Sequence, residues 1–254
     1  MTSVHDAAVR RAELASGLAK VQERIRAACM AAGRVREDVQ LIVVTKFFPG
    51  ADIEVLCELG VTDIGENRDQ EASAKIASLP PEVRQRLQVH FIGQMQTNKA
   101  RSVATYADTV HSIDRDRLAI ALERAAAAAG RVIGALVQVN LDAIAGADAV
   151  SGGGAVAGPA RGGIPLDGVA ELANIVAAAP HLRLRGLMGV APLGVDPGAV
   201  FARLATASRD LRSDHPGATW ISAGMSADLE SAVANGATHL RVGSAILGSR
   251  PFRG

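Results

Sequence analysis

The chain of 254 residues lacks several features that mark particular classes of protein. Its two cysteines, Cys29 and Cys57, lie far apart in helix-like sequence, which excludes a disulfide framework and indicates a reducing compartment. No apolar run approaches the roughly 20 residues of a membrane-spanning helix, and the amino-terminal stretch carries charges where a signal peptide needs an apolar core. These absences predict a cytoplasmic protein that has no membrane partner.

An excess of charge of either sign is also missing. The 27 basic and 26 acidic side chains give a formal net charge of +1, and neither sign gathers into a long block. A nucleic-acid partner is therefore not expected, although a small anion can still be held locally. The six histidines and two cysteines show no metal-ligand spacing, so we predict no metal site.

What the chain does have is a regular alternation of strand-like and helix-like stretches. Apolar runs such as "VQLIVVT" and "LQVHFIG" alternate with alanine-rich amphipathic pieces, giving about eight β–α units in the chain. This pattern predicts an α/β fold, a single TIM (β/α)8 barrel that forms one domain over residues 1–254. Leu14, Leu18, Val21 and Ile25 are spaced by three and four residues, which predicts an additional amino-terminal helix within residues 1–33, outside the barrel count.

One segment breaks the alternation. Residues 142–163, "DAIAGADAVSGGGAVAGPARGG", are rich in glycine and alanine and have no period. We interpret this segment as a loop insertion after the fifth strand. A disordered insertion and a lid over the active face of a barrel both fit its composition.

The carboxyl ends of barrel strands are where active sites lie, and Lys46 follows the first predicted strand directly. An ammonium group between Phe47 and aliphatic strand residues loses hydration, which favours the neutral, nucleophilic amine. The sequence therefore offers Lys46 as an amine that reacts with carbonyl groups. The alternative is a strand-end lysine that extends its ammonium group into solvent.

The last two predicted strands are each followed by glycine beside serine, in "SAGMS" and "RVGS". Backbone N–H groups and hydroxyls in such loops hold anions, and phosphate sites in barrels commonly use these two loops. Ser226 alternatively caps a helix. Arg241 points to the same side of its strand as Gly243, and it either pairs with a carboxylate such as Glu66 or Asp228 or donates to a bound cofactor.

Longer motifs that cover nearly the whole chain carry a resemblance. "VVTKFFP", "DIGENRDQE", "HFIGQMQTNKAR", "LRGLMGVAP" and "SAGMSADLESAVANGATHLRVGSAILGSR" occur in order. With them the chain resembles the pyridoxal phosphate homeostasis proteins, the YggS/PROSC family, whose barrel is shared with the amino-terminal domain of alanine racemase. This resemblance implies a barrel that binds pyridoxal 5'-phosphate (PLP).

The resemblance also implies roles for individual residues. The Schiff-base lysine corresponds to Lys46, the phosphate-binding serine to Ser226, and the arginine that faces the pyridine nitrogen to Arg241. The implied cofactor-binding residues are Lys46, Asn67, Ser226, Arg241, Gly243 and Ser244. The implied function is to carry PLP in intracellular homeostasis, with PLP-dependent apo-enzymes as recipients and without catalysis.

Two departures from the family pattern stand out. The long insertion ends in Arg161, Gly162 and Gly163 where relatives have a short loop with a lysine-serine-glycine motif, and Arg68 replaces an aromatic residue that often follows the G-E-N motif. A lysine in that loop is therefore not available here to handle the cofactor, and packing after the second strand is expected to differ.

Two enzymatic alternatives stay open. The first is a slow PLP-dependent amino-acid racemase, although a two-base racemase needs a second base and the single tyrosine, Tyr106, lies in a helix-like stretch. The second is an aldolase that forms a Schiff base with a sugar phosphate without any cofactor. An arginine at the pyridine nitrogen can only donate, which leaves the ring a poor electron sink and disfavours carbanion chemistry.

Overall fold

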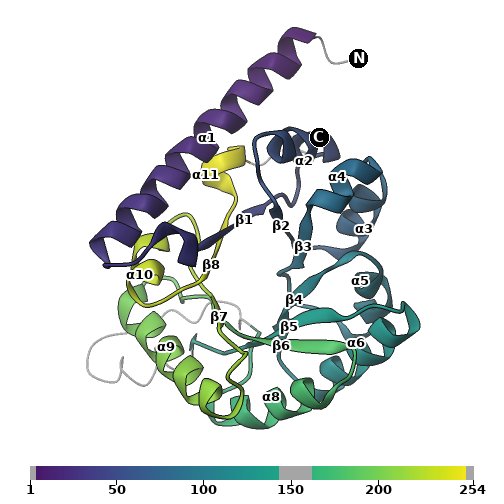
Figure 1. Ribbon diagram of the computed structural model, residues 1–254, viewed down its shortest axis with the longest axis vertical. Coiled ribbons are helices and arrows are strands. Elements are labelled where there is room, and N and C mark those ends of the chain that lie inside the picture. The colour runs from purple at the N-terminus through teal and green to yellow at the C-terminus, as the bar shows by residue number, and fades with distance from the viewer. Residues whose placement is uncertain (1–3, 143–161, 250–254) are drawn as a thin grey trace.

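The computed structural model describes residues 4–142 and 162–249, and it confirms the predicted barrel. Eight parallel strands close into a ring in chain order, with β8 paired to β1 (Figure 1). The strands are β1 (Gln40–Val44), β2 (Asp63–Glu66), β3 (Gln88–Phe91), β4 (Thr109–Ile113), β5 (Ile133–Gln138), β6 (Leu182–Met188), β7 (Trp220–Ser222) and β8 (His239–Val242).

Helices surround the ring of strands (Figure 1). They are α1 (Val4–Ala31), α2 (Gly50–Glu58), α3 (Asp69–Ala77), α4 (Pro81–Arg86), α5 (Ala100–Tyr106), α6 (Asp116–Ala128), α8 (Val169–Ala178), α9 (Pro197–Asp214), α10 (Leu229–Ala234) and α11 (Ser244–Leu247). Three short 3-10 helices are η1 (Arg36–Asp38), η2 (Thr97–Lys99) and η3 (Leu166–Gly168). None of the helices in the described ranges is long and apolar enough to cross a membrane.

The predicted amino-terminal helix is α1, and its apolar face is buried as expected, with Leu14 and Ile25 fully covered. This helix lies across the outside of the barrel and contacts α10 and α11 (Figure 1). At Gly17 the approach is so close that a Cβ atom would lie 2.6 Å from the carbonyl oxygen of Ile246 in α11. The additional helix therefore supports the last β–α unit of the barrel.

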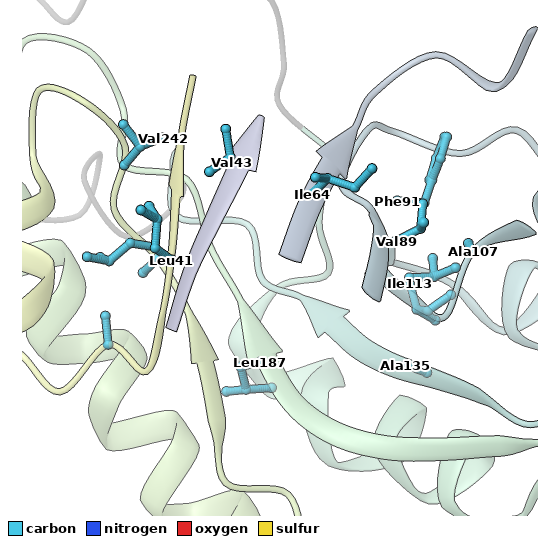
Figure 2. Close-up of a cluster of buried hydrophobic side chains, with 14 of the residues drawn as sticks. Leu41, Val43, Ile64, Val89, Phe91, Ala107, Ile113, Ala135, Leu187 and Val242 are labelled. Carbon is cyan, nitrogen blue, oxygen red and sulfur yellow. The ribbon is translucent and has the colours of Figure 1, made fainter. Parts of the chain in front are cut away.

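Each strand has one face toward the helices and one toward the barrel interior. The outward side chains join one apolar cluster with the helices, and Figure 2 shows ten labelled members of this cluster. They are Leu41, Val43, Ile64, Val89, Phe91, Ala107, Ile113, Ala135, Leu187 and Val242. The inward positions alternate with these, so that Ile42 of β1 and its register partner Arg241 of β8 lie inside the barrel. The interior is where the polar residues of the strands meet.

Cys29 and Cys57 are both buried and both free, which agrees with the expected absence of a disulfide between them. Most of the predicted insertion, residues 143–161, lies outside the described residues. Where the chain is described again, Ile164 pairs with Val139, the residue that follows β5. The described chain therefore resumes beside the end of β5.

Candidate functional site

The carboxyl ends of β8, β1 and β2 bring three of the predicted site residues together. The last register pair of β1 and β2 is Val44 with Gly65, so Lys46 and Asn67 each follow their strand at the same level. On the other side of β1, a Cβ atom at Gly243 would lie 3.0 Å from the carbonyl oxygen of Val44. Lys46 is therefore flanked by Asn67 on one side and by the glycine of the last loop on the other.

Lys46 is half-buried, and its Nζ lies 5.9 Å from the centre of the Phe47 ring. Phe47 has a φ of 72°, a left-handed conformation that no other non-glycine residue of the described ranges adopts. Such strain in a bulky residue persists only where the surroundings hold it. Here the backbone N–H of Phe47 donates to the carboxylate of Glu71 in α3, which anchors the turn that carries the lysine.

Behind this turn lies a buried ion pair that the sequence did not reveal. Lys75 of α3 donates to Glu66 at 2.8 Å and to the carbonyl oxygen of Thr45 at 2.9 Å, and the Thr45 hydroxyl also donates to Glu66 at 2.7 Å. Burial raises the pKa of Glu66, although Lys75 acts to lower it. The network therefore fixes the backbone of the residue directly before Lys46.

The two predicted phosphate loops meet at their serines. The hydroxyl oxygens of Ser226 and Ser244 are 3.4 Å apart, and neither hydroxyl caps a helix by a side-chain hydrogen bond in the described structure. The alternative of Ser226 as a helix cap is therefore wrong. Arg24 of α1 donates to the carbonyl oxygen of Ser226 at 3.0 Å and pairs with Glu230, which holds this loop from outside the barrel.

Arg241 is almost completely buried inside the barrel below these loops. Its Nη1 donates to the Ser222 hydroxyl at 2.6 Å and its Nη2 to the carbonyl oxygen of Gly189 at 2.9 Å. Burial lowers the pKa of Arg241 to about 10, so the guanidinium stays charged at neutral pH. The charge of Asp228 acts to raise this pKa, but within the described ranges Arg241 forms no salt bridge with Glu66 or Asp228.

A cavity of about 910 Å³ opens beside Asn67 and extends over the loops after β2 and β3. Of the predicted cofactor residues, only Asn67 lines it, so this cavity adjoins the Lys46 turn without containing it. Arg68 also lines the cavity, and its guanidinium lies 5.1 Å from the centre of the Phe47 ring. The guanidinium of Arg68 thus packs on the Phe47 ring by a cation–π contact. Packing after the second strand was expected to differ because Arg68 stands where relatives often have an aromatic residue.

Other expectations concern residues away from the barrel mouth. His90 and His111 are buried inside the barrel. Tyr106 is buried in α5, where burial raises its pKa and its hydroxyl is 3.5 Å from Asp69. Arg161 lies outside the described residues. Gly162 is the first described residue after the gap, and its carbonyl oxygen accepts a hydrogen bond from Gln138 at 2.6 Å.

Comparison with known proteins gives the family. Residues 17–251 match the model of the alanine racemase N-terminal domain. The pyridoxal phosphate homeostasis protein of Mycobacterium bovis is 40% identical over 260 residues, which cover 96% of this chain and 95% of that protein. The chain belongs to the pyridoxal phosphate homeostasis protein family. The family member of Escherichia coli is 36% identical, with 94% of this chain and 98% of that protein covered.

Solved structures agree with this assignment to the homeostasis protein family. PipY of Synechococcus elongatus, in a structure with PLP bound, matches at a TM-score of 0.73 and 31% identity, covering 92% of this chain and 100% of that one. Alanine racemase of Corynebacterium glutamicum matches at a TM-score of 0.64 and 16% identity, covering 95% of this chain and 62% of that one. The second match shows a shared fold alone.

The donors at the barrel mouth fit the cofactor of this family. PLP has a phosphate, an aldehyde and a ring nitrogen, which require hydrogen-bond donors, an amine and a polar partner respectively. The paired hydroxyls of Ser226 and Ser244 suit a phosphate, and the space that a Cβ atom at Gly243 would fill lets a ligand approach the backbone. Lys46 has a primary amine at the end of β1, and the guanidinium of the buried Arg241 is a hydrogen-bond donor.

Proposed function

We propose that this protein binds PLP through Lys46 and holds it for intracellular PLP homeostasis. The observation that supports this most directly is the convergence of Lys46, the Gly243 backbone and the Ser226–Ser244 pair at the ends of adjacent strands. The PLP-bound state of PipY supports the choice of ligand. When bound, PLP supplies an aldehyde that condenses with a primary amine.

In this proposal each residue of the site has a definite role. Lys46 provides the amine, and the Glu71-anchored turn at Phe47 keeps that amine at the barrel mouth. Ser226 and Ser244 donate to the phosphate, Asn67 contacts the cofactor beside the lysine, and Arg241 donates toward the ring nitrogen. The positive charge of Arg241 favours binding of the anionic ligand as a whole.

The groups around the proposed cofactor site are suited to binding PLP and not to catalysis. Arg241 donates and does not accept, so it leaves a ring nitrogen unprotonated and a poor electron sink. The single tyrosine is buried in α5 with a raised pKa, which makes it unsuitable as a second base. We therefore propose a binding protein and not a racemase.

The direct test is to add PLP to the purified protein, record the visible absorption spectrum, reduce with borohydride and locate the adduct by peptide mass spectrometry. We expect a pyridoxyl group on Lys46 and its loss in Lys46→Ala. Lys20, an exposed lysine on α1, gives the matched control variant Lys20→Ala, which should label as the wild type does. An unlabelled Lys46, or equal binding by Lys46→Ala, would refute the proposal.

The racemase alternative is favoured by one observation, the match to the alanine racemase N-terminal domain. Incubation of the PLP-loaded protein with L-alanine, followed by chiral analysis, distinguishes it. We expect the enantiomer ratio to stay at that of a sample without protein. A ratio that moves toward equality in the wild type, and not in Lys46→Ala, would favour the enzyme.

We also propose that PLP-dependent apo-enzymes receive the cofactor and that this takes place in the cytoplasm. The free, buried Cys29 and Cys57 support a reducing compartment. Mixing the PLP-loaded protein with an excess of an apo-aminotransferase tests the transfer, because activity should then appear faster than from PLP bound to serum albumin at the same concentration. Equal or slower appearance would contradict a role in delivery.

A further inference from the structure

A continuous path of hydrogen bonds crosses the barrel interior from Arg241. Arg241 contacts Ser222 of β7 at 2.6 Å, and the Ser222 hydroxyl lies 2.9 Å from Nδ1 of His111 in β4. Nε2 of His111 is 2.9 Å from Nδ1 of His90 in β3, and Nε2 of His90 is 2.9 Å from Asp63 in β2. Because β4 and β7 are not neighbours in the barrel, the link between them passes through the interior.

The interior path excludes solvent along its length. His111 and Ser222 are fully buried, His90 is 1% exposed, and Arg241 is 4% exposed. His111 is neutral, because burial and the charge of nearby groups hold its pKa well below the usual value. Hydrogen bonds inside such a region are electrostatically stronger than in water and polarise one another.

The donors along this path can run in one direction. A guanidinium only donates, so Ser222 accepts from Arg241, and the Ser222 proton then has His111 Nδ1 as its acceptor. A neutral His111 with an unprotonated Nδ1 carries its proton on Nε2 and donates to His90. By the same rule His90 donates from Nε2 to Asp63. Every link therefore points from the guanidinium toward the carboxylate.

Asp63 is suited to end the path as an anion. Its second oxygen accepts from Gln40 at 2.6 Å and from the Thr62 hydroxyl at 2.6 Å. Burial acts to raise the pKa of Asp63, but the hydrogen bonds from His90 and Thr62 bring it below its ordinary value. The path thus joins a cation near the barrel mouth, through Ser222, His111 and His90, to an anion at the first residue of β2.

We propose that Ser222, His111, His90 and Asp63 are positioning residues that form a one-directional donor chain and fix the orientation in which Arg241 meets the cofactor. This inference rests on the proposed function, because the donor chain orients the arginine that the proposed function places at the ring nitrogen of PLP. The anion at Asp63 polarises the two imidazoles, which strengthens the acceptor that Ser222 offers to Arg241. Nη2, held by the Gly189 carbonyl, gives the guanidinium its second fixed point.

The donor chain makes a prediction that needs no cofactor. Nitrogen-15 NMR of the imidazoles in PLP-free wild-type protein at pH 7 should show a proton on Nε2 and none on Nδ1 in both His90 and His111. The guanidinium NH groups of Arg241 should give separate, slowly exchanging signals, because two acceptors hold them. A proton on Nδ1 of either histidine would overturn the direction of the chain and with it the proposal.

Variants test whether the donor chain acts on the cofactor. Ser222→Ala and His111→Phe remove a link, and Asp63→Asn removes the terminal charge while keeping an acceptor for His90. We expect Ser222→Ala and His111→Phe to weaken PLP affinity on the order of tenfold. All three should shift the absorption maximum of bound PLP, and Asp63→Asn should change the nitrogen-15 shifts of both histidines.

The matched control is His239→Asn, which removes a buried histidine of the same interior that stacks on Trp220 at 3.9 Å and lies outside the donor chain. Its PLP affinity should stay within about twofold of that of the wild type, and the absorption maximum of its bound PLP should not shift. Folded chain variants that bind PLP as the wild type does would overturn the proposal, as would a His239→Asn effect as large as theirs. If the wild-type protein forms the adduct on Lys46 but the variants of the donor chain bind PLP as it does, only the donor-chain proposal is refuted. If the wild-type protein binds no PLP, the proposed function is refuted as well.

Discussion

At the scale of single residues, the ion pair of Glu66 and Lys75 determines how firmly the Lys46 turn is held. Both side chains are buried, with Glu66 fully covered and Lys75 at 8% exposure. Removing one partner of such a pair leaves an uncompensated buried charge. Lys75→Met should therefore lower the free energy of unfolding by about 3–5 kcal/mol, measured by urea denaturation at pH 7.

The matched variant for this prediction removes both charges. In Glu66→Gln combined with Lys75→Met the fully buried charge of Glu66 is removed together with that of Lys75, so most of the lost stability should return, while Thr45 keeps an acceptor at the amide oxygen of residue 66. Glu71, which also accepts from Lys75 at 3.2 Å, keeps the backbone N–H of Phe47 as a donor. A double variant as unstable as Lys75→Met would contradict the assignment of the loss to the Glu66 charge.

A second residue-scale prediction concerns Gly93, in the loop that follows β3. A Cβ atom at Gly93 would lie 2.1 Å from the carbonyl oxygen of Asn67, so no side chain fits without moving that backbone. Gly93→Ala should cost about 1–3 kcal/mol of stability and weaken PLP binding by displacing Asn67. Gly217→Ala is the control, because nothing lies within 4 Å of a Cβ atom there, and its stability and PLP affinity should match the wild type.

At the scale of elements, α1 supports the site although it lies outside the barrel. It contacts α11, which begins at Ser244, and its Arg24 holds the carbonyl oxygen of Ser226. The two serines expected to bind the phosphate are thus both linked to one helix at the surface. This explains how a helix that adds nothing to the ring of strands can still affect the site.

The contact of α1 with α11 gives a prediction with an unusual sign. Replacing a glycine by alanine inside a helix normally stabilises it by about 1 kcal/mol. At Gly17 the new Cβ atom would lie 2.6 Å from the Ile246 carbonyl oxygen, so Gly17→Ala should instead lower the melting temperature and weaken PLP binding by displacing α11. Ser16→Ala, at an exposed position of the same helix, should leave PLP binding unchanged and should not lower the melting temperature, because alanine is the better helix former. A Gly17→Ala protein more stable than the wild type would contradict the close packing.

At the scale of the whole molecule, the sequence was sufficient to predict the ring of strands and the outer helix. Alternating apolar runs and amphipathic stretches reflect burial on two faces of each strand, a property that depends on local spacing. Lys46 and the serine loops could also be predicted, because barrel sites follow strand ends. The domain assignment over residues 1–254 stays a prediction, as do the roles of the cofactor residues.

The parts of the site that could not be predicted depend on contacts between distant residues. Lys75 shows only an i, i+4 spacing to Glu71 in the sequence, and nothing in that spacing indicates that it reaches Glu66 and the Thr45 backbone. In the same way, His111 and Ser222 are 111 residues apart and meet only because β4 and β7 face each other across the interior. The packing of the closed barrel, and not local pattern, produces both arrangements.

The buried histidines of the interior predict how the stability of the whole molecule depends on pH. Burial lowers the pKa of His239 to about 3 and that of His111 well below its usual value. Below a pH of about 6.5 the unfolded chain takes up protons on both residues that the folded chain does not bind, so acid favours unfolding. Between pH 6 and pH 4.5 the free energy of unfolding should therefore fall with decreasing pH, by up to about 1.4 kcal/mol per pH unit for each histidine. Urea titrations at several pH values measure the slope, and His239→Asn should reduce it by about half. A stability unchanged from pH 7 to pH 5 would mean that His111 and His239 take up protons in the folded chain as readily as in the unfolded chain.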